Sequence, residues 1–189
     1  MDTIFTLSSP MGPLHLAADG AALTGLWLEG QKYFAATLTG REQTAGLPVF
    51  DEARHWLDAY FSGKTPGPLP PLAPRGSAFR QEVWKLLLEI PRGETTTYGA
   101  LAERLRTRGM AASAQAVGGA VGHNPISILI PCHRVVGSDG SLTGYAGGLD
   151  KKRKLLELEG ADLSRPYTPV EKGRCRKTSG KSVMPCPSR

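Results

Sequence analysis

Hydrophobic and polar residues alternate in three short stretches near the start of the chain. These stretches are Thr3–Leu7, Leu14–Ala18 and Leu23–Leu28, and turn-forming residues at 10–12 and 19–20 separate them. Alternation with turn signals between the runs is typical of neighbouring antiparallel strands. The pattern therefore predicts a small antiparallel meander.

A helical pattern follows these stretches. Apolar residues recur at helical spacing within residues 50–61, which predicts one amphipathic helix. Residues 63–74 are rich in proline and glycine. Because proline offers no N–H group and restrains its neighbours, this segment is predicted to be an extended linker. We expect residues 1–74 to form an N-terminal supporting domain that ends in this Pro-rich linker.

The next part of the chain, residues 75–163, is dominated by helical patterns. Ser77 is the expected N-cap of a helix over residues 80–90. Two short helices are predicted over residues 99–105 and 111–122, with a glycine-containing turn between them. This order of helix, tight turn and helix is the outline of a helix-turn-helix.

Shorter elements complete this second domain. Residues 127–130 predict a short buried strand that ends at Pro131, and a glycine-rich loop covers residues 137–148. A last helix is predicted over residues 151–158. The expected fold class is α+β, with a small N-terminal sheet domain and a C-terminal helical, winged-helix-like domain that carries the helix-turn-helix.

Residues 164–189 are basic, contain proline, serine, glycine and lysine, and lack apolar periodicity, so they predict a disordered tail. The formal net charge of +6 arises in this tail, because residues 1–164 are neutral in sum. Within those residues the part before Arg75 is acidic and the part after it is basic. This asymmetry weakly favours a polyanionic partner for the second domain and the tail.

Three cysteines occur, at positions 132, 175 and 186. Their odd number and irregular spacing predict reduced thiols, with Cys175 and Cys186 incidental, and a cytoplasmic location. The N-terminus does not resemble a secretory signal. No apolar run approaches the ~20 residues of a membrane helix, so no membrane association is expected.

The candidate chemistry centres on the segment ISILIPCHRVVG, at residues 126–137. A thiolate is the nucleophilic form of cysteine, and an adjacent histidine lowers the thiol pKa or accepts its proton. Neighbouring residues of an extended strand face opposite sides. Either the chain turns at Pro131, or Cys132 reaches His133 through a bridging water. By itself the Cys–His pair is weak evidence, because a structural cysteine beside a buried histidine is the more common arrangement.

The surrounding motifs resemble the family of methylated-DNA–protein-cysteine methyltransferases, also called O6-alkylguanine-DNA alkyltransferases. The matching stretches are FRQEVWKLL, IPRGETTTYGALAERL, AQAVGGAVGHNPISILIPCHRVVG and GYAGGLDKKRKLLELEG. The resemblance is strong over residues 77–160 and loose before them. It implies DNA repair by a single-turnover transfer of a methyl or alkyl group from O6-alkylguanine to Cys132. O4-alkylthymine is a second candidate substrate.

The resemblance also implies roles for individual residues. Cys132 corresponds to the alkyl acceptor, His133 to the residue that takes the thiol proton through a water, and Glu159 to the carboxylate that orients this histidine. Tyr98 corresponds to the tyrosine that helps to turn the nucleotide out and protonates the leaving base. Asn124 corresponds to the residue that bridges the recognition helix and the active-site segment. The pocket and the DNA-binding surface would include Ala114, Gln115, Val121, Val135, Tyr145, Ala146 and Gly147.

The predicted helix over residues 111–122 supports such a role. A major-groove reading helix needs long polar side chains, whereas this helix consists of small residues and Gln115. Small residues permit close backbone approach in the minor groove, with Gln115 filling the gap left by a flipped guanine. The expected partner is double-stranded alkylated DNA, and the protein is expected to act as a monomer without cofactor or metal.

Two departures and two alternatives accompany this interpretation. Well-known members carry arginine where this chain has Gln115, which predicts weaker nucleotide flipping. Some relatives bind zinc in the N-terminal part, where this chain has no cysteine. A winged-helix regulator with a structural or redox-sensing Cys132 is one alternative, because relatives without the cysteine only bind damage. The other is a cysteine hydrolase using Cys132, His133 and Glu159, which would need an oxyanion hole.

Overall fold

The computed structural model describes residues 2–38, 43–44 and 46–163. The expectations for the tail at 164–189, including Cys175 and Cys186, lie outside these residues. Within the described part of the chain, no helix is both long and apolar enough to cross a membrane.

The predicted meander is confirmed with the expected bounds. Strands β1 (Thr3–Leu7), β2 (Leu14–Ala18) and β3 (Leu23–Leu28) pair antiparallel in sequence order. A two-residue strand, β4 (Gln43–Thr44), adds parallel to β1 and makes the sheet mixed. A strand this short has no periodicity, so the sequence could not indicate it.

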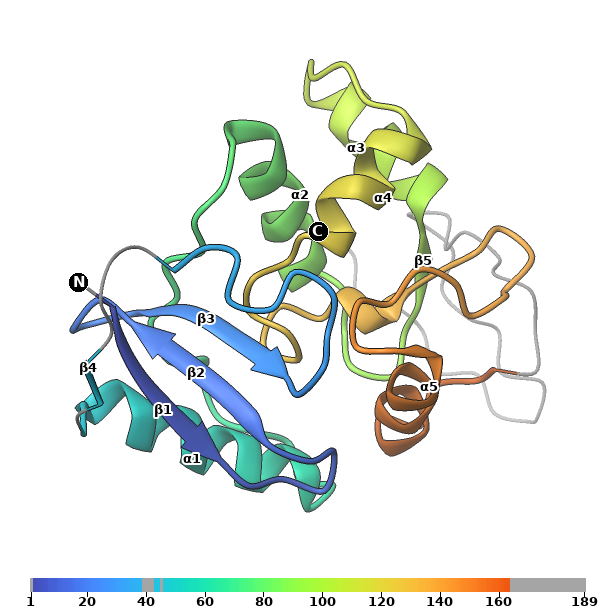
Figure 1. Ribbon diagram of the computed structural model, residues 1–189. Helices are drawn as coiled ribbons and strands as arrows, with labels where there is room; N and C mark the ends of the chain where they lie inside the picture. The colour runs from blue at the N-terminus through green and yellow to red at the C-terminus, as the bar shows by residue number, and fades with distance from the viewer. Residues whose placement is uncertain (1, 39–42, 45, 164–189) are drawn as a thin grey trace, which may run out of the picture.

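Helix α1 (Pro48–Phe61) lies across one face of this sheet (Figure 1). Proline at the first helical turn costs no hydrogen bond and sets the dihedral angle that a helix needs. The helix buries one apolar face, and Phe50 stacks on Phe5 of β1 with ring centroids 5.4 Å apart. Burial of each large apolar side chain stabilises the fold by about 1.5–3 kcal/mol.

The linker at residues 63–74 contains no helix, as expected for an extended linker, and it runs along the edge of the sheet. Leu23 of β3 donates its N–H to Pro71 at 2.8 Å and accepts a hydrogen bond from Ala73 at 2.7 Å. Three residues further along β3, Leu26 pairs with Ile126 of the second domain. The free edge of β3 is therefore the seam between the two parts of the chain.

Helices α2 to α5 lie beyond this edge (Figure 1). They are α2 (Ala78–Leu88), α3 (Tyr98–Thr107), α4 (Ala114–Gly122) and α5 (Leu149–Leu158). A two-stranded parallel ribbon, β5 (Thr96–Thr97) with β6 (Val135–Val136), stands beside them. The observed fold is therefore the expected α+β arrangement, with α3 and α4 as the helix-turn-helix.

Side-chain caps decide where these helices begin. The Ser77 hydroxyl accepts from the N–H of Arg80, which confirms the predicted cap of α2. Helix α4 begins at Ala114, because the Ser113 hydroxyl accepts from the N–H of Ala116. The predicted start at residue 111 was wrong. The small residues before Ser113 resemble those of the helix, so the pattern extended the predicted helix beyond its true first residue. The capping residue is what marks where the helix begins.

The strand predicted over residues 127–130 was wrong. After the single bridge at Ile126 the chain folds into consecutive turns, with Ile128 in the left-handed region at φ 73°. The Asn124 side chain accepts from the N–H of Ile126 at 3.1 Å and donates to the carbonyl of Ile130 at 2.8 Å. A buried side chain thus supplies the hydrogen bonds that sheet pairing would otherwise provide.

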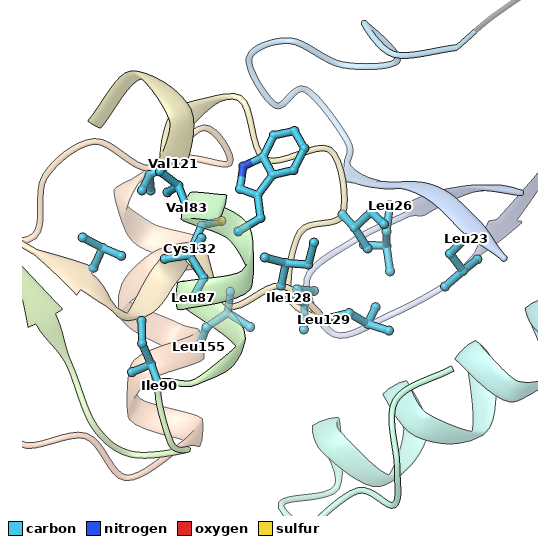
Figure 2. Close-up of a cluster of buried hydrophobic side chains, with 14 of the residues drawn as sticks. Leu23, Leu26, Val83, Leu87, Ile90, Val121, Ile128, Leu129, Cys132 and Leu155 are labelled. Carbon is cyan, nitrogen blue, oxygen red and sulfur yellow. The ribbon is translucent and has the colours of Figure 1, made fainter. Parts of the chain in front are cut away.

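The core extends without interruption across the seam. Figure 2 shows Leu23 and Leu26 of β3 in one cluster with Val83 and Leu87 of α2 and with Cys132. The Trp84 indole belongs to the same buried cluster and donates to the carbonyl of Ala120 at 2.9 Å, which joins α2 to α4. The segment that carries Cys132 is therefore held from both halves of the molecule.

Candidate active site

Cys132 begins a single turn of 3-10 helix, η1 (Cys132–Arg134), directly after Pro131. The chain therefore turns at Pro131 and does not continue as an extended strand. The Cys132 side chain lies in the core, and the residue is only 5% exposed. Burial raises the pKa of its thiol, while a hydrogen bond with Asn124 and the charge of Lys152 act in the opposite direction. The thiol is therefore protonated at rest and needs a base for activation.

His133 is fully buried and contacts Glu159, the C-cap residue of α5. Its Nε2 lies 2.8 Å from Glu159 Oε1. Nε2 therefore carries the ring hydrogen and donates a hydrogen bond to the Glu159 carboxylate. The other ring nitrogen, Nδ1, is buried and has no hydrogen-bond partner among the described residues. This tautomer leaves Nδ1 with a free lone pair that can accept a proton.

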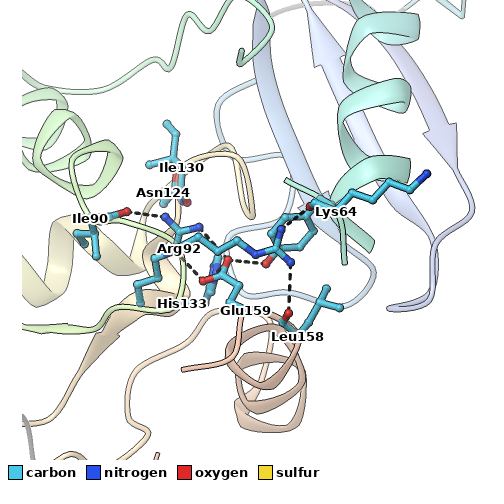
Figure 3. Close-up of polar contacts among 10 residues, drawn as sticks. Lys64, Ile90, Arg92, Asn124, Ile130, His133, Leu158 and Glu159 are labelled. Carbon is cyan, nitrogen blue, oxygen red and sulfur yellow. Dashed lines mark hydrogen bonds and ion pairs between the residues drawn. The ribbon is translucent and has the colours of Figure 1, made fainter. Parts of the chain in front are cut away.

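The Glu159 carboxylate receives further hydrogen bonds. Arg134 donates through Nε to Oε2 and through Nη2 to Oε1, both at 2.8 Å, and holds the carbonyl of Ile90 with Nη1 at 2.6 Å. The Tyr60 hydroxyl of α1 donates to Oε1 at 2.7 Å. Part of this network is drawn in Figure 3. The carboxylate is thus fixed by three residues from two elements, His133 and Arg134 of η1 and Tyr60 of α1.

These contacts set the charges of the site. Burial alone would raise the pKa of Glu159, but hydrogen bonds and charges of His133 and Arg134 outweigh it and hold the pKa well below its ordinary value. Burial lowers the pKa of His133 despite the opposing effect of Glu159. At neutral pH the pair is therefore a neutral imidazole beside an ionised carboxylate, as a proton acceptor requires.

Tyr98 lies at the edge of a cavity of about 350 Å³, which is also lined by Ala114, Gly118, Thr143 and Gly144. Its hydroxyl donates to the carbonyl of Thr143 at 3.1 Å. Burial raises the pKa of this phenol, so it stays protonated and can act as a proton donor. The cavity thus lies between the helix-turn-helix and the loop at residues 137–148.

The other predicted pocket and DNA-binding residues lie in three different places. Tyr145, Ala146 and Gly147 lie on the loop, where the carbonyl of Ala146 accepts from the N–H of Lys32 at 2.9 Å. Val121 and Val135 are buried in the core and do not line the cavity. Gln115 is exposed on the first turn of α4.

A larger cavity, of about 930 Å³, is lined by residues from the end of α2 to α3 and by Ser138. None of the predicted site residues lines it. Within the described residues, no cluster of three or more histidine, cysteine, aspartate or glutamate side chains could hold a metal ion.

Three residues of the site were not found from the sequence. Lys152 is fully buried, and its Nζ donates to the carbonyls of Val135 at 2.5 Å and Thr143 at 2.6 Å. Burial lowers its pKa to about 8. Arg134 and Tyr60 hold Glu159. Lys152 follows Lys151 in a basic run that reads as a solvated helix face, and Tyr60 fits the apolar face of α1, so neither gave a sequence signal.

The chain matches two family models. Residues 5–69 match the one described as 6-O-methylguanine DNA methyltransferase, ribonuclease-like domain. Residues 78–161 match the one described as 6-O-methylguanine DNA methyltransferase, DNA binding domain.

Individual relatives agree with these models. A methylated-DNA–protein-cysteine methyltransferase of Mycobacterium tuberculosis is 47% identical over 154 residues, which cover 82% of this chain and 90% of the relative. One from Haemophilus influenzae is 44% identical over 152 residues, covering 80% and 82%. The crystal structure of M. tuberculosis OGT in complex with DNA aligns with a TM-score of 0.74 and 45% identity, covering 84% of this chain and 92% of that one.

A cysteine, a histidine and a glutamate joined to a helix-turn-helix define a DNA-repair transferase of the cysteine-dependent class. The sequence and the fold of this chain point to one family within that class. The chain belongs to the methylated-DNA–protein-cysteine methyltransferases.

Proposed function

We propose that this protein removes the methyl group of O6-methylguanine in DNA by transferring it to its own Cys132. The observation that carries the proposal is that His133, the residue directly after Cys132, is paired with Glu159. Nε2 of His133 is committed to the carboxylate, while Nδ1 is buried with its lone pair available. A cysteine placed next to such a base can be deprotonated on demand.

The proposed reaction is one in-line displacement. His133 takes the Cys132 proton through a water molecule, and the sulfur attacks the methyl carbon while the carbon–oxygen bond of the base breaks. Tyr98 donates a proton to N3 of the leaving guanine. A thioether forms that has no easy hydrolytic route back, so each molecule reacts once. Longer alkyl groups and O4-alkylthymine are further candidate substrates of the same step.

The reacting atom of a base is hidden inside a duplex, so the nucleotide must leave the stack. We propose that α4 docks in the minor groove, where Ala114 and its other small residues permit close approach. Gln115 would fill the gap of a flipped guanine. Asn124, Val121 and Val135 would support the pocket, and Tyr145, Ala146 and Gly147 would form its wall. The relative from M. tuberculosis was crystallised with DNA, and we expect the present chain to bind DNA as a monomer.

The division of labour along the chain is part of the proposal. Residues 1–74 would support the site, residues 75–163 would bind DNA and react, and residues 164–189 would add a modest, salt-dependent affinity. A nucleophilic free thiol requires a reducing compartment, which favours the cytoplasm.

The test is the mass of the intact protein after incubation with a duplex that contains O6-methylguanine. The expected result is a gain of one methyl group per molecule on the peptide that contains Cys132, and no gain for Cys132→Ser or for an undamaged duplex. Binding without transfer would support a regulator, and repeated release of methylated product would support a hydrolase.

A further inference from the structure

Tyr60 links the N-terminal part of the chain directly to the reactive network. It lies in the last turn of α1, is only 1% exposed, and donates its hydroxyl to Glu159 Oε1 at 2.7 Å. The two residues are 99 positions apart in the sequence. Tyr60 is thus a contact between the sheet domain and the Cys132–His133–Glu159 cluster.

The Tyr60 ring is held tightly by other aromatic rings. Trp56 stacks on it with centroids 5.3 Å apart and an interplanar angle of 13°, and Phe61 meets it edge-on at 5.4 Å. A ring confined on two sides has little freedom to turn, so the direction of its hydroxyl group is set by the packing of α1.

A cation holds the same ring from the second domain. The Arg92 guanidinium lies 5.4 Å from the Tyr60 ring centroid. Figure 3 shows Arg92 reaching both Lys64, just after α1, and Leu158, at the end of α5. Arg92 donates to the carbonyl of Lys64 at 2.5 Å and to that of Leu158 at 3.3 Å. This bridge fixes the distance between α1, which carries Tyr60, and the end of α5, which Glu159 caps.

We propose, on the basis of the function proposed above, that Tyr60 is a positioning residue for methyl transfer, through which the N-terminal domain orients Glu159 and limits the basicity of His133. Oε1 of Glu159 receives hydrogen bonds from His133, Arg134 and Tyr60 together. Each donor withdraws negative charge from the oxygen that faces the imidazole. With Tyr60 in place, Glu159 holds the imidazole in one orientation without stabilising too strongly the imidazolium that forms when Nδ1 takes the proton.

The phenol suits this role because it remains a donor at every pH at which the protein works. Burial and the neighbouring Glu159 charge raise the pKa of Tyr60 far above its ordinary value. Other ionisable and charged groups also surround the His133–Glu159 pair, from η1, α5, the loop and the segment before β5. They are Cys132, Arg134, Lys152, Tyr145 and Arg92. Substitution of Tyr60 leaves all of these in place.

The test is single-turnover methyl transfer by Tyr60→Phe, which keeps the ring and removes only the hydroxyl group. We expect the rate constant at saturating DNA to fall about tenfold, since a hydrogen bond to a charged group is lost. The affinity for DNA should be unchanged. The acidic limb of the rate–pH profile should shift upward by about half a pH unit, because a less neutralised Glu159 raises the pKa of His133.

Phe61→Leu is the matched control, because it loosens the same aromatic cluster without touching Glu159. It should leave the position of the acidic limb unchanged. A Tyr60→Phe protein with the wild-type rate and pH profile would overturn the inference and leave the proposed function intact. An equal fall in rate for both variants, without a shift of the limb, would show a merely structural role. Failure of the wild type to accept a methyl group would remove both proposals.

Discussion

At Cys132, burial and hydrogen bonding act on the thiol in opposite directions. Burial raises its pKa, and the Asn124 hydrogen bond and the Lys152 charge only partly offset this effect. In the proposed reaction the thiolate therefore forms when His133 accepts the proton, and does not persist beforehand. The reactivity of this residue depends on its partners more than on its exposure.

The His133–Glu159 pair makes stability depend on pH. Both folded-state pKa values lie below their ordinary values, so the unfolded chain binds more protons than the folded protein on the acidic side. The free energy of unfolding should be highest above about pH 6.5, the ordinary pKa of histidine, and should fall as the pH decreases below it, first through His133 and then, below about pH 4.5, also through Glu159. Urea denaturation at a series of pH values measures this slope.

His133→Asn is the control for this prediction, because it removes the titrating imidazole. The slope between pH 6.5 and 5.5 should become shallower in that variant. A wild-type stability that is constant or rises as the pH falls through this window would contradict the assignment of a neutral, buried His133.

Asn124 determines the local path of the chain. Asn124→Ala should lower the free energy of unfolding by about 2 kcal/mol, because the buried N–H of Ile126 and the carbonyl of Ile130 lose this partner. Chemical denaturation measures the loss. Ser127→Ala is the comparison. The Ser127 hydroxyl group donates to Gln31, which lies outside this turn, so its loss leaves the hydrogen bonds of Asn124 in place. An equal loss in both variants would argue against a special role of the Asn124 side chain.

At the scale of elements, α4 shows how a cap and small residues define a surface. Ser113 sets its first turn, and Gly118 lies beside the Tyr98 ring, where an added Cβ would be in ordinary van der Waals contact at 3.7 Å. On the opposite wall, a Cβ at Gly144 would lie 2.7 Å from the Tyr98 hydroxyl group. The cavity beside Tyr98 therefore depends on the absence of a side chain at Gly144, which also has a positive φ of 68°.

Gln115 is the long side chain exposed on the first turn of this helix. Gln115→Arg should bind a duplex with O6-methylguanine more tightly, because a longer, charged group fills the space of a flipped nucleotide and contacts phosphates. A fluorescence titration with damaged and undamaged duplex measures the effect. Unchanged or weaker affinity for the damaged duplex would argue against the gap-filling role.

At the scale of the whole molecule, one ion pair attaches the beginning of the second domain to the sheet. Arg75 donates both terminal nitrogens to the buried Asp2 carboxylate, each at 2.6 Å. Arg75→Ala should lower the free energy of unfolding by about 3 kcal/mol, because a buried charge loses its bidentate partner. Thermal and urea unfolding measure this loss.

The double variant Asp2→Asn with Arg75→Ala tests the cause. It should recover part of the lost stability, because the charge of the buried carboxylate is then gone. A double variant that is less stable than Arg75→Ala would show that the contribution of Asp2 does not depend on this ion pair.

Much of the architecture followed from local patterns. The three long strands, helix α1, the cap at Ser77 and the helix-turn-helix were predicted, because periodicity and capping act over a few residues. The strand over 127–130 was not correct, since an apolar run has the same appearance in a buried turn as in a strand. Strand β4 and the roles of Tyr60 and Lys152 gave no local signal.

The sequence by itself determined most of the order of elements and the α+β class through residue types at short spacing, and its resemblance to the family indicated the positions that carry the chemistry. Only the tertiary structure decided that Glu159 meets His133 through Nε2, that Tyr60 and Arg134 share the same carboxylate, and that Lys152 is buried. These contacts join residues that are far apart along the chain. They depend on how α1, α5 and the segment after Pro131 pack together, which no local pattern encodes.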